Sequence, residues 1–416
     1  MSSTAKPALS GRAAFSHPSF FQYQLARFFI VLTLEMQSVA VGWQVYEITR
    51  EPFHLGLVGL LQFLPMFALF LFAGHLADVM NRVKLLTICY GGFAVCSLLL
   101  LVSTLSAPDS VYPIYAVLAL VGVVRAFSGP VSRALLPQLV PDEDLPNAVA
   151  WNGTFFQAAT ILGPAIGGVI YALFRGASSV YVLAILSATA AMVSTLRIRT
   201  RPMPLREREQ TSLRTVLAGL RYIRDHRLVL GAISLDLFAV LLGGAVALLP
   251  VFAREILHTG PWGLGVLRSA PAVGAVATAI FLAYQPLRSR AGAIMLWCVG
   301  GFGVFTAVFG LSRSLALSFV ALLLVGAADM VSVVVRATLI QLATPDAMRG
   351  RVNAVELIFV GASNELGQFE SGLAAHWLGP VPAVVLGGIG TIAVTLIWAW
   401  RFPELRRVNQ LTDIRV

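Results

Sequence analysis

Long apolar runs alternate along the chain with short polar connections. A helix that spans a membrane needs about 20 mostly apolar residues, and these runs reach that length. They predict twelve spanning helices at residues 23–47, 53–77, 84–106, 111–136, 147–173, 177–196, 228–252, 260–284, 291–311, 314–341, 352–377 and 381–401. The pattern therefore predicts an all-α integral membrane protein.

The composition indicates that lipid, rather than water, is the solvent for this chain. Of its 416 residues, 57% are hydrophobic and 12% are charged, whereas a soluble domain contains about 25% charged residues. A soluble core could not hide so much apolar surface. The first 22 residues are polar and lack the apolar core of a cleavable signal peptide, so we expect the first span to direct insertion.

The basic residues are distributed unevenly between the two sides of the predicted membrane. The chain has 30 lysines and arginines, of which Arg125 and Arg268 lie within spans. Only a few fall in the loops on one side: Arg50, Arg175, Arg254 and Arg313. The positive-inside rule places the other side, which carries both termini, in the cytoplasm. The formal charge of +10 therefore indicates orientation rather than nucleic-acid binding.

A polar, arginine-rich segment divides the chain near its middle. The predicted organisation is a cytoplasmic N-terminus (1–22), a six-helix bundle (23–196), a cytoplasmic linker (197–227), a second six-helix bundle (228–401) and a cytoplasmic tail (402–416). In the linker, apolar residues recur at helical spacing between Thr211 and His226, with arginines largely on the other side. This predicts an amphipathic helix on the inner leaflet; the alternative is a solvated tether between the bundles.

The two halves repeat one loop in the same topology. Arg133-Ala-Leu-Leu-Pro-Gln-Leu ends the fourth span, Arg336-Ala-Thr-Leu-Ile-Gln-Leu ends the tenth, and Asn147-Ala-Val and Asn353-Ala-Val open the helices that follow. Parallel repeats of this kind fit two pseudo-symmetric bundles with a substrate site between them. Arg133 and Arg336 are therefore candidate gating residues.

The connection between the second and third spans places an acid and a base between two apolar segments: Gly74-His-Leu-Ala-Asp78-Val-Met-Asn-Arg82. Charges are costly at a membrane boundary unless they hold something in place. The stretch resembles the corresponding loop of the major facilitator superfamily, although Val79 replaces a common arginine and Asn81 a common glycine. The resemblance implies a solute transporter of alternating-access type, with Gly74, Asp78 and Arg82 as gating groups.

A second motif, Arg125-Ala-Phe-Ser-Gly in the fourth span, resembles the Arg-x-x-Gln-Gly motif of the same superfamily, with Ser128 in place of the glutamine. A fixed charge inside a span needs a partner or water. Arg125 therefore either handles protons with a neighbouring carboxylate or forms a buried bridge that locks helices together.

A third motif lies in the fifth span and consists of Gly163, Pro164, Gly167 and Gly168. It resembles the Gly-Pro-x-x-Gly-Gly signature of superfamily members that export by antiport. Glycines at this spacing let helix backbones touch, and the proline bends the helix. The resemblance favours export over import.

Acidic residues inside the spans are candidates for carrying protons, because an uncompensated carboxyl group in lipid favours its neutral form. Glu35 in the first span and Asp236 in the seventh are the preferred candidates, since no basic residue is near them in sequence. Asp329 lies seven residues before Arg336 on the same helical face, so we expect it to pair with Arg336 or Arg125.

The eleventh span contributes three more acids. Glu356 and Glu370 share a helical face with Ser363, and Glu365 points elsewhere. Glu370 is therefore a further candidate for proton coupling, whereas Glu356 is expected to be solvated near the inner surface.

Polar and aromatic side chains within spans are candidates for lining a substrate cavity: Gln37, Trp43, Gln44, Phe63, Phe155, Phe238 and Arg268. Arg268 stands beside Pro271, where the eighth span is expected to break, and its charge suits an acidic or catecholate-like group. The scattered histidines and cysteines show no metal-ligand spacing, and no Gly-rich phosphate-binding loop is followed by lysine. We therefore expect no metal, no cofactor and no use of ATP.

Whole segments, such as 39–46 and 236–250, are similar to the branch of bacterial exporters related to the enterobactin (siderophore) exporter and to drug–proton antiporters. This implies a monomeric exporter in the bacterial inner membrane, driven by the proton gradient and acting on a small amphipathic molecule. Its partners are expected to be that substrate and membrane lipids.

Two alternatives remain open at this point. One is an importer or lipid-moving carrier of the same fold. The other is a polytopic membrane enzyme, which would need His, Asp or Ser clustered at one membrane face; His54, His75 and His258 form no such cluster.

Overall fold

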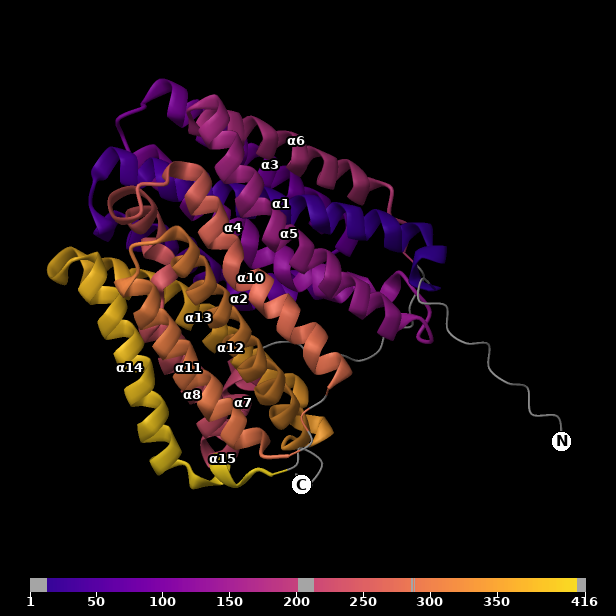
Figure 1. Ribbon diagram of the computed structural model, residues 1–416. Coiled ribbons are helices and arrows are strands. Elements are labelled where there is room, and N and C mark those ends of the chain that lie inside the picture. Colours follow the sequence, from indigo (N-terminus) through magenta and orange to yellow (C-terminus); the bar gives the residue numbers. More distant parts are fainter. Residues whose placement is uncertain (1–12, 201–212, 286, 288, 410–416) are drawn as a thin grey trace.

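The computed structural model describes residues 13–200, 213–285, 287 and 289–409, apart from the side chains of Leu71, Ala77, Asp78, Leu213, Arg214 and Ala347. Parts of the predicted N-terminus, linker and tail lie outside these ranges. The described residues form helices and no strands (Figure 1). The long helices are α1 (Pro18–Thr49), α2 (Pro52–Val79), α3 (Arg82–Ser106), α4 (Tyr112–Leu135), α5 (Leu145–Phe174), α6 (Ala177–Leu196), α8 (Arg227–Leu242), α10 (Gly260–Tyr284), α11 (Ala291–Leu311), α12 (Leu315–Leu342), α13 (Asp346–Leu378) and α14 (Pro380–Arg401).

Within the described ranges, eleven helical segments are long and apolar enough to cross a membrane, which confirms a multi-pass membrane protein. Helix α13 is long enough but too polar to count among them. It nevertheless packs along α2 and α8 as a spanning helix would. Its polar residues are explained below by the cavity that it lines.

The helices pack in two groups that repeat the same contacts. In the first group α1 packs on α5 and α6, α2 on α4, and α3 on α4 and α6. In the second, the segment beginning with α8 packs on α13 and α14, α10 on α12, and α11 on α12 and α14. The predicted pseudo-symmetry is thus visible in the packing, and the groups meet mainly where α5 contacts α10 and α2 contacts α13 (Figure 1).

The seventh span is broken rather than continuous, which corrects the sequence-based expectation. Helix α8 ends at Leu242, and the chain continues through a 3₁₀ turn (Ala245–Leu248), a short helix α9 (Leu249–Val251) and a π-helical turn (Phe252–Ile256). The break falls at Gly243-Gly244, where a Cβ on Gly244 would lie 2.7 Å from the carbonyl oxygen of Gly367. Glycine is needed there because the backbone touches α13.

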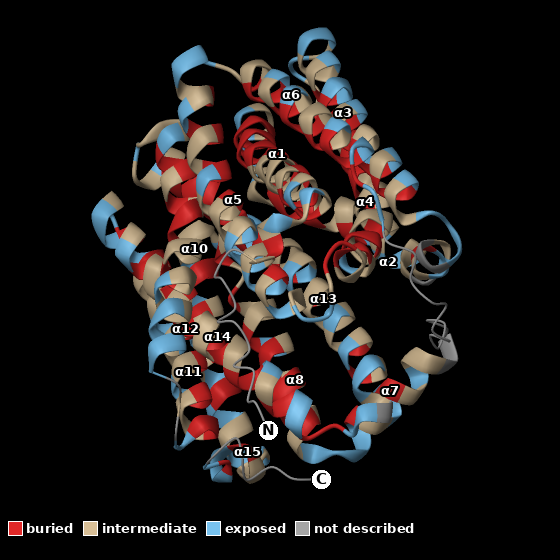
Figure 2. Ribbon diagram, turned by 90° about the vertical axis from the view of Figure 1, so that its right-hand side faces the viewer, coloured by how far each residue is buried: buried red, intermediate tan, exposed pale blue. Residues whose placement is uncertain are grey.

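The linker contains the predicted amphipathic helix, α7 (Leu213–Asp225), but this helix is docked on the second bundle (Figure 2). Ile223 is buried in the core of that bundle, and Tyr222 Oη donates a 2.9 Å hydrogen bond to Ala343 O. Burial raises the pKa of Tyr222. Leu217 and Leu220 stay exposed. The interpretation as a solvated tether is therefore wrong for residues 213–225, because one face of the helix is packed against protein.

Candidate functional site: a charged cavity between the bundles

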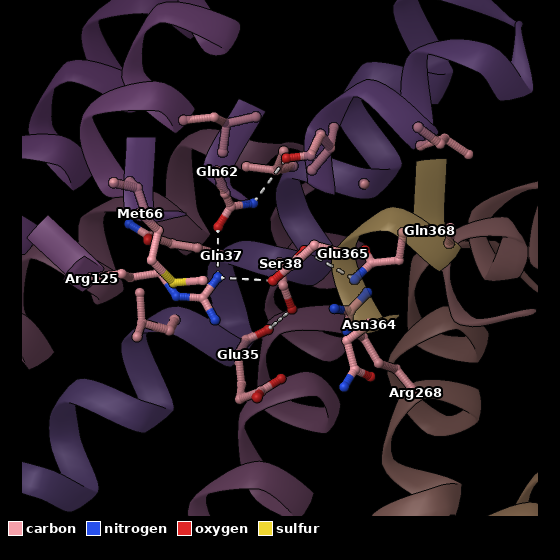
Figure 3. A pocket seen from close by; sticks show the side chains of 18 of the residues that line it. Glu35, Gln37, Ser38, Gln62, Met66, Arg125, Arg268, Asn364, Glu365 and Gln368 are labelled. Atoms are coloured by element: carbon pink, nitrogen blue, oxygen red, sulfur yellow. Dashed lines mark hydrogen bonds and ion pairs between the residues drawn. The ribbon is translucent and has the colours of Figure 1, made fainter. Parts of the chain in front are cut away.

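A cavity of about 390 Å³ lies where the two groups of helices meet (Figure 3). Helices α1, α2 and α4 line one side, and α10, α13 and the segment after α8 line the other. Its wall combines aliphatic side chains with a polar set: Glu35, Gln37, Ser38, Gln62, Arg125, Arg268, Asn364, Glu365 and Gln368. The site is therefore built by both halves of the chain.

An ion pair crosses the cavity from one group of helices to the other. Arg125 Nη1 on α4 lies 3.4 Å from Glu365 Oε1 on α13, and it also donates to Gln62 Oε1 at 3.2 Å. Gln368 Nε2 donates to the second carboxylate oxygen of Glu365 at 3.2 Å. A Cβ on Gly59 would lie only 3.1 Å from that oxygen, so glycine leaves room for the bridge. The predicted neighbouring carboxylate of Arg125 is thus Glu365.

Glu35 on α1 and Arg268 on α10 face the same cavity, but their side chains form no hydrogen bond or ion pair within the described residues (Figure 3). Each charge still acts on the other across the space. Glu35 is pressed against α5, where a Cβ on Gly163 would lie 2.5 Å from its own Cβ. Gly163 of the third motif therefore makes room for the Glu35 side chain.

A second cavity of about 420 Å³ adjoins the first, and the two share Leu34, Met66, Arg125 and Gly361. We refer to it as the aromatic chamber, because Phe63, Phe67 and Phe70 line it. It also contacts the predicted gating residues Gly74 and Arg133, near the ends of α2 and α4. The chamber therefore extends from the charged cavity toward the end of the molecule where α1 begins, which we call the terminal end.

The end where α1 finishes, the opposite end, is held closed. Arg254 of the π-helical turn lies 3.3 Å from Glu47 Oε1 and stacks over the ring of Trp43 at 5.4 Å. Tyr171 Oη on α5 donates to the other oxygen of Glu47 at 3.0 Å. The helices diverge from this end toward the terminal end (Figure 1). Trp43 thus lies in this closure and not in the cavity.

Gly168 of the third motif places α5 against α10 close to the opposite end. A Cβ there would lie 2.6 Å from Pro261 O and 2.9 Å from the Cα of Gly265. Gly167 likewise touches Met36 on α1. The motif therefore packs one helix against both bundles, as its spacing predicts.

Replacing Gly168 with valine is expected to destabilise the protein by about 1–3 kcal/mol, because backbone atoms cannot move aside as a flexible side chain can. Gly153→Val on the same helix is the matched control, since nothing lies within 4 Å of a Cβ at that position. Unfolding of the purified variants in detergent measures the difference. Equal stability of the two variants would contradict the packing argument.

The preferred candidate Asp236 has a basic partner in the structure, although no basic residue is near it in sequence. Arg336 on α12 forms an ion pair with Asp236 Oδ1 on α8, and its Nε lies 3.4 Å from Glu356 Oε1 on α13. The contact between Asp236 and Arg336 could not be predicted from sequence, because the two residues lie on different helices that are far apart in the chain. Glu356 is likewise paired rather than simply solvated, and Arg336 is a buried bridge inside the second bundle.

Asp329 is not the partner of Arg336 or Arg125 in the structure. Together with Asp236 and Ser332 it lines a void of about 10 Å³, which is at the lower limit for holding one water molecule. Glu370 is half-buried and accepts a 3.5 Å hydrogen bond from Ser371 Oγ. The charged cavity does not include either acid.

The remaining candidates are dispersed. Gln37 lines the cavity and donates to Ser97 Oγ at 2.6 Å, while Gln44 bonds Thr104 and Tyr181 toward the opposite end. Phe155 packs in an aromatic cluster with Phe15, Phe28 and Trp151 through tilted and edge-on ring contacts, and Phe238 packs on Trp398. Arg82 Nη1 donates to Ala134 O at 3.1 Å. The Asp78 side chain lies outside the described residues.

Three cavity residues on α13 had not been identified from sequence: Asn364, Glu365 and Gln368. They share a face with Gly361 and Gly372, at the three- and four-residue spacing of one helical side. The excess of polar residues in the eleventh span was the signal that pointed to them, because a helix surrounded by lipid would not contain such a stripe. Glu365 therefore points into the cavity, from a helical face other than the one that Glu356 and Glu370 share.

Comparisons with known proteins agree with this architecture. The profile of a family described as transmembrane secretion effectors matches residues 9–414. The enterobactin exporter EntS of Citrobacter koseri is 27% identical over 395 residues, which cover 95% of this chain and 94% of the relative. EntS of Shigella boydii serotype 18 shows the same identity and coverage.

Solved structures share the fold at lower identity. A bacterial homologue of the iron transporter ferroportin, in an inward-facing state, has a TM-score of 0.70 at 16% identity, covering 94% of this chain and 98% of that one. The nucleoside transporter NupG has a TM-score of 0.68 at 14% identity, covering 94% and 99%. These relatives and structural neighbours are transporters, so the chain is a transporter and not an enzyme.

Proposed function

Because this chain belongs to the transmembrane secretion effector family of the major facilitator superfamily, we propose that it exports a small amphipathic organic molecule across the bacterial inner membrane in exchange for protons. The substrate class is siderophore-like or drug-like, as suits the similarity to enterobactin exporters. The observation that carries the proposal is the charged cavity, which both bundles build and which continues into the aromatic chamber.

The same arrangement supports transport by alternating access. The closed opposite end, the diverging helices at the terminal end and the crossing bridge between Arg125 and Glu365 support an inward-facing state, with both termini in the cytoplasm. Rocking of the bundles would break the closure at Arg254 and expose the cavity on the other side. No metal, cofactor or second subunit enters this scheme.

Glu35 is the carboxylate we assign to proton coupling, because it faces the cavity without a bonded partner. Arg268 is assigned to an acidic or catecholate-like group of the substrate. We assign Asp236 a structural role instead, because it forms an ion pair with Arg336.

Transport into proteoliposomes under an imposed pH gradient tests the proposal, with amphipathic drugs and catecholate siderophores as substrates. We expect gradient-driven movement by the wild type and its loss in Glu35→Gln, since an amide cannot exchange a proton. Glu143→Gln, which changes an exposed acid in the turn before α5, is the matched control. Movement that ignores the gradient would refute proton coupling, and movement in the opposite direction would establish an importer.

A further inference from the structure

The four charges of the cavity form two acid–base pairs, and each pair crosses between the bundles. The first bundle contributes Glu35 and Arg125, and the second contributes Arg268 and Glu365. Arg125 and Glu365 are in contact at 3.4 Å. Glu35 and Arg268 are not bonded, and both side chains reach the cavity (Figure 3). One pair is therefore closed, and the other is open to a ligand.

The described residues around the open pair, Glu35 and Arg268, form no hydrogen bond or ion pair with either side chain, so a bound ligand can pair with both charges. The charged groups that act on Glu35 are Arg268 on α10 and Arg125 on α4. Helix α5 places Gly163 against the Glu35 side chain. Arg268 is acted on by Glu35 and by Glu365 on α13. Because Glu365 is already engaged by Arg125, a ligand reaching the cavity meets one unbonded acid and one unbonded base.

The sign of proton coupling depends on which of the two charges the ligand takes. An anion on Arg268 cancels the positive field that favours the carboxylate form of Glu35, so anion and proton would bind together. A cation on Glu35 has the opposite effect, because it competes with the proton for the same carboxylate. Only the second sign gives exchange of substrate for protons.

We infer that the cavity binds an amphipathic zwitterion, whose cationic group pairs with Glu35 and whose anionic group pairs with Arg268. This inference rests on the proton exchange proposed above. The apolar body of the ligand lies in the aromatic chamber, against Phe63 and Phe67. On binding, the O–H bond of protonated Glu35 breaks and its proton passes to water at the terminal end. The ligand cation takes its place, and no electrons are exchanged.

Four probes that share the same aromatic tail and differ only in the charge of the head group isolate the effect of that charge. Nε-dansyl-lysine is zwitterionic, its Nα-acetyl derivative is anionic, its methyl ester is cationic, and the Nα-acetyl methyl ester is neutral. Binding to the full chain in lipid nanodiscs is followed by dansyl fluorescence, and protons released into weak buffer are followed with a pH indicator. Size-exclusion profiles verify that every variant is folded.

We expect the zwitterion to bind about tenfold more tightly than either singly charged probe, because it gains a second charge-assisted contact. Its binding should release protons, whereas binding of the anion should take them up. Glu35→Gln should abolish the release and lower zwitterion affinity to that of the anion. Arg268→Gln should lower it to that of the cation, and Glu35→Asp should restore proton release.

Equal or tighter binding of the anionic probe, or no binding of any probe to folded protein, overturns the zwitterion assignment. Neither result bears on the exchange measured in vesicles with other substrates. Preferential binding of the zwitterion without proton release would instead contradict proton exchange while supporting the substrate class. The two hypotheses therefore fail by different readouts.

Discussion

Replacing Arg336 with methionine is expected to lower the free energy of unfolding by about 3–5 kcal/mol, because it leaves two buried carboxylates without a counter-charge. The Arg336 side chain is 5% exposed, and its partners Asp236 and Glu356 are 10% and 18% exposed. The three groups join α8, α12 and α13. Chemical unfolding of the purified protein in detergent measures the loss.

Arg224→Met is the matched control for that variant. Arg224 and its partner Asp225 are 74% and 54% exposed, and an exposed ion pair contributes at most about 1 kcal/mol. Replacing Arg336, Asp236 and Glu356 together with apolar residues should recover much of the stability, since no charge is then left unpaired. Wild-type stability of Arg336→Met would show that the bridge is not structural.

Breaking the ion pair between Arg125 and Glu365 is expected to have a large effect on the rate of transport. Arg125→Gln and Glu365→Gln should each slow substrate transport about thirtyfold, because each leaves its partner's charge unpaired between the bundles. The transport rate of the double variant should fall by less than the product of the two single losses, which corresponds to a coupling energy of about 0.5–3 kcal/mol. Initial rates in proteoliposomes complete the double-mutant cycle.

Gln62→Leu tests the surroundings of the bridge while leaving the ion pair itself in place. It removes the 3.2 Å hydrogen bond that Arg125 donates to Gln62 and the bond that Gln62 Nε2 donates to Val58 O within α2. We expect a smaller loss than in either charge variant. Independent, multiplicative effects of Arg125→Gln and Glu365→Gln would mean that the two residues do not act as a pair.

Several features of the fold could be predicted because they depend on local sequence. Helices α6, α10 and α11 begin and end at the predicted residues, since turns and polar connections bound their apolar runs. The break after Leu242 was missed, although Gly243-Gly244 is present in the sequence. Glycine is frequent in membrane helices, and only the contact with Gly367 shows why this glycine pair interrupts one.

The candidate site was predictable only in part. Glu35, Arg125 and Arg268 stand out in sequence because a charge in an apolar run is costly. The partner of Arg125 did not stand out, because pairing depends on helices that are distant in the chain: Arg125 finds Glu365 across 240 residues. For the same reason Asp236 looked unpaired in the sequence, although Arg336 forms an ion pair with it in the structure.

The sequence by itself determined that this protein lies in a membrane, that its chain repeats in two halves and that it is built like a transporter. Those properties follow from apolar length, charge placement and motifs, each of which is encoded within a few tens of residues. Only the tertiary structure decided which charges meet. Arg125 and Glu365 meet across the bundle interface, where Gly59 leaves room for the bridge, whereas Glu35 and Arg268 face the same cavity without a bond between them.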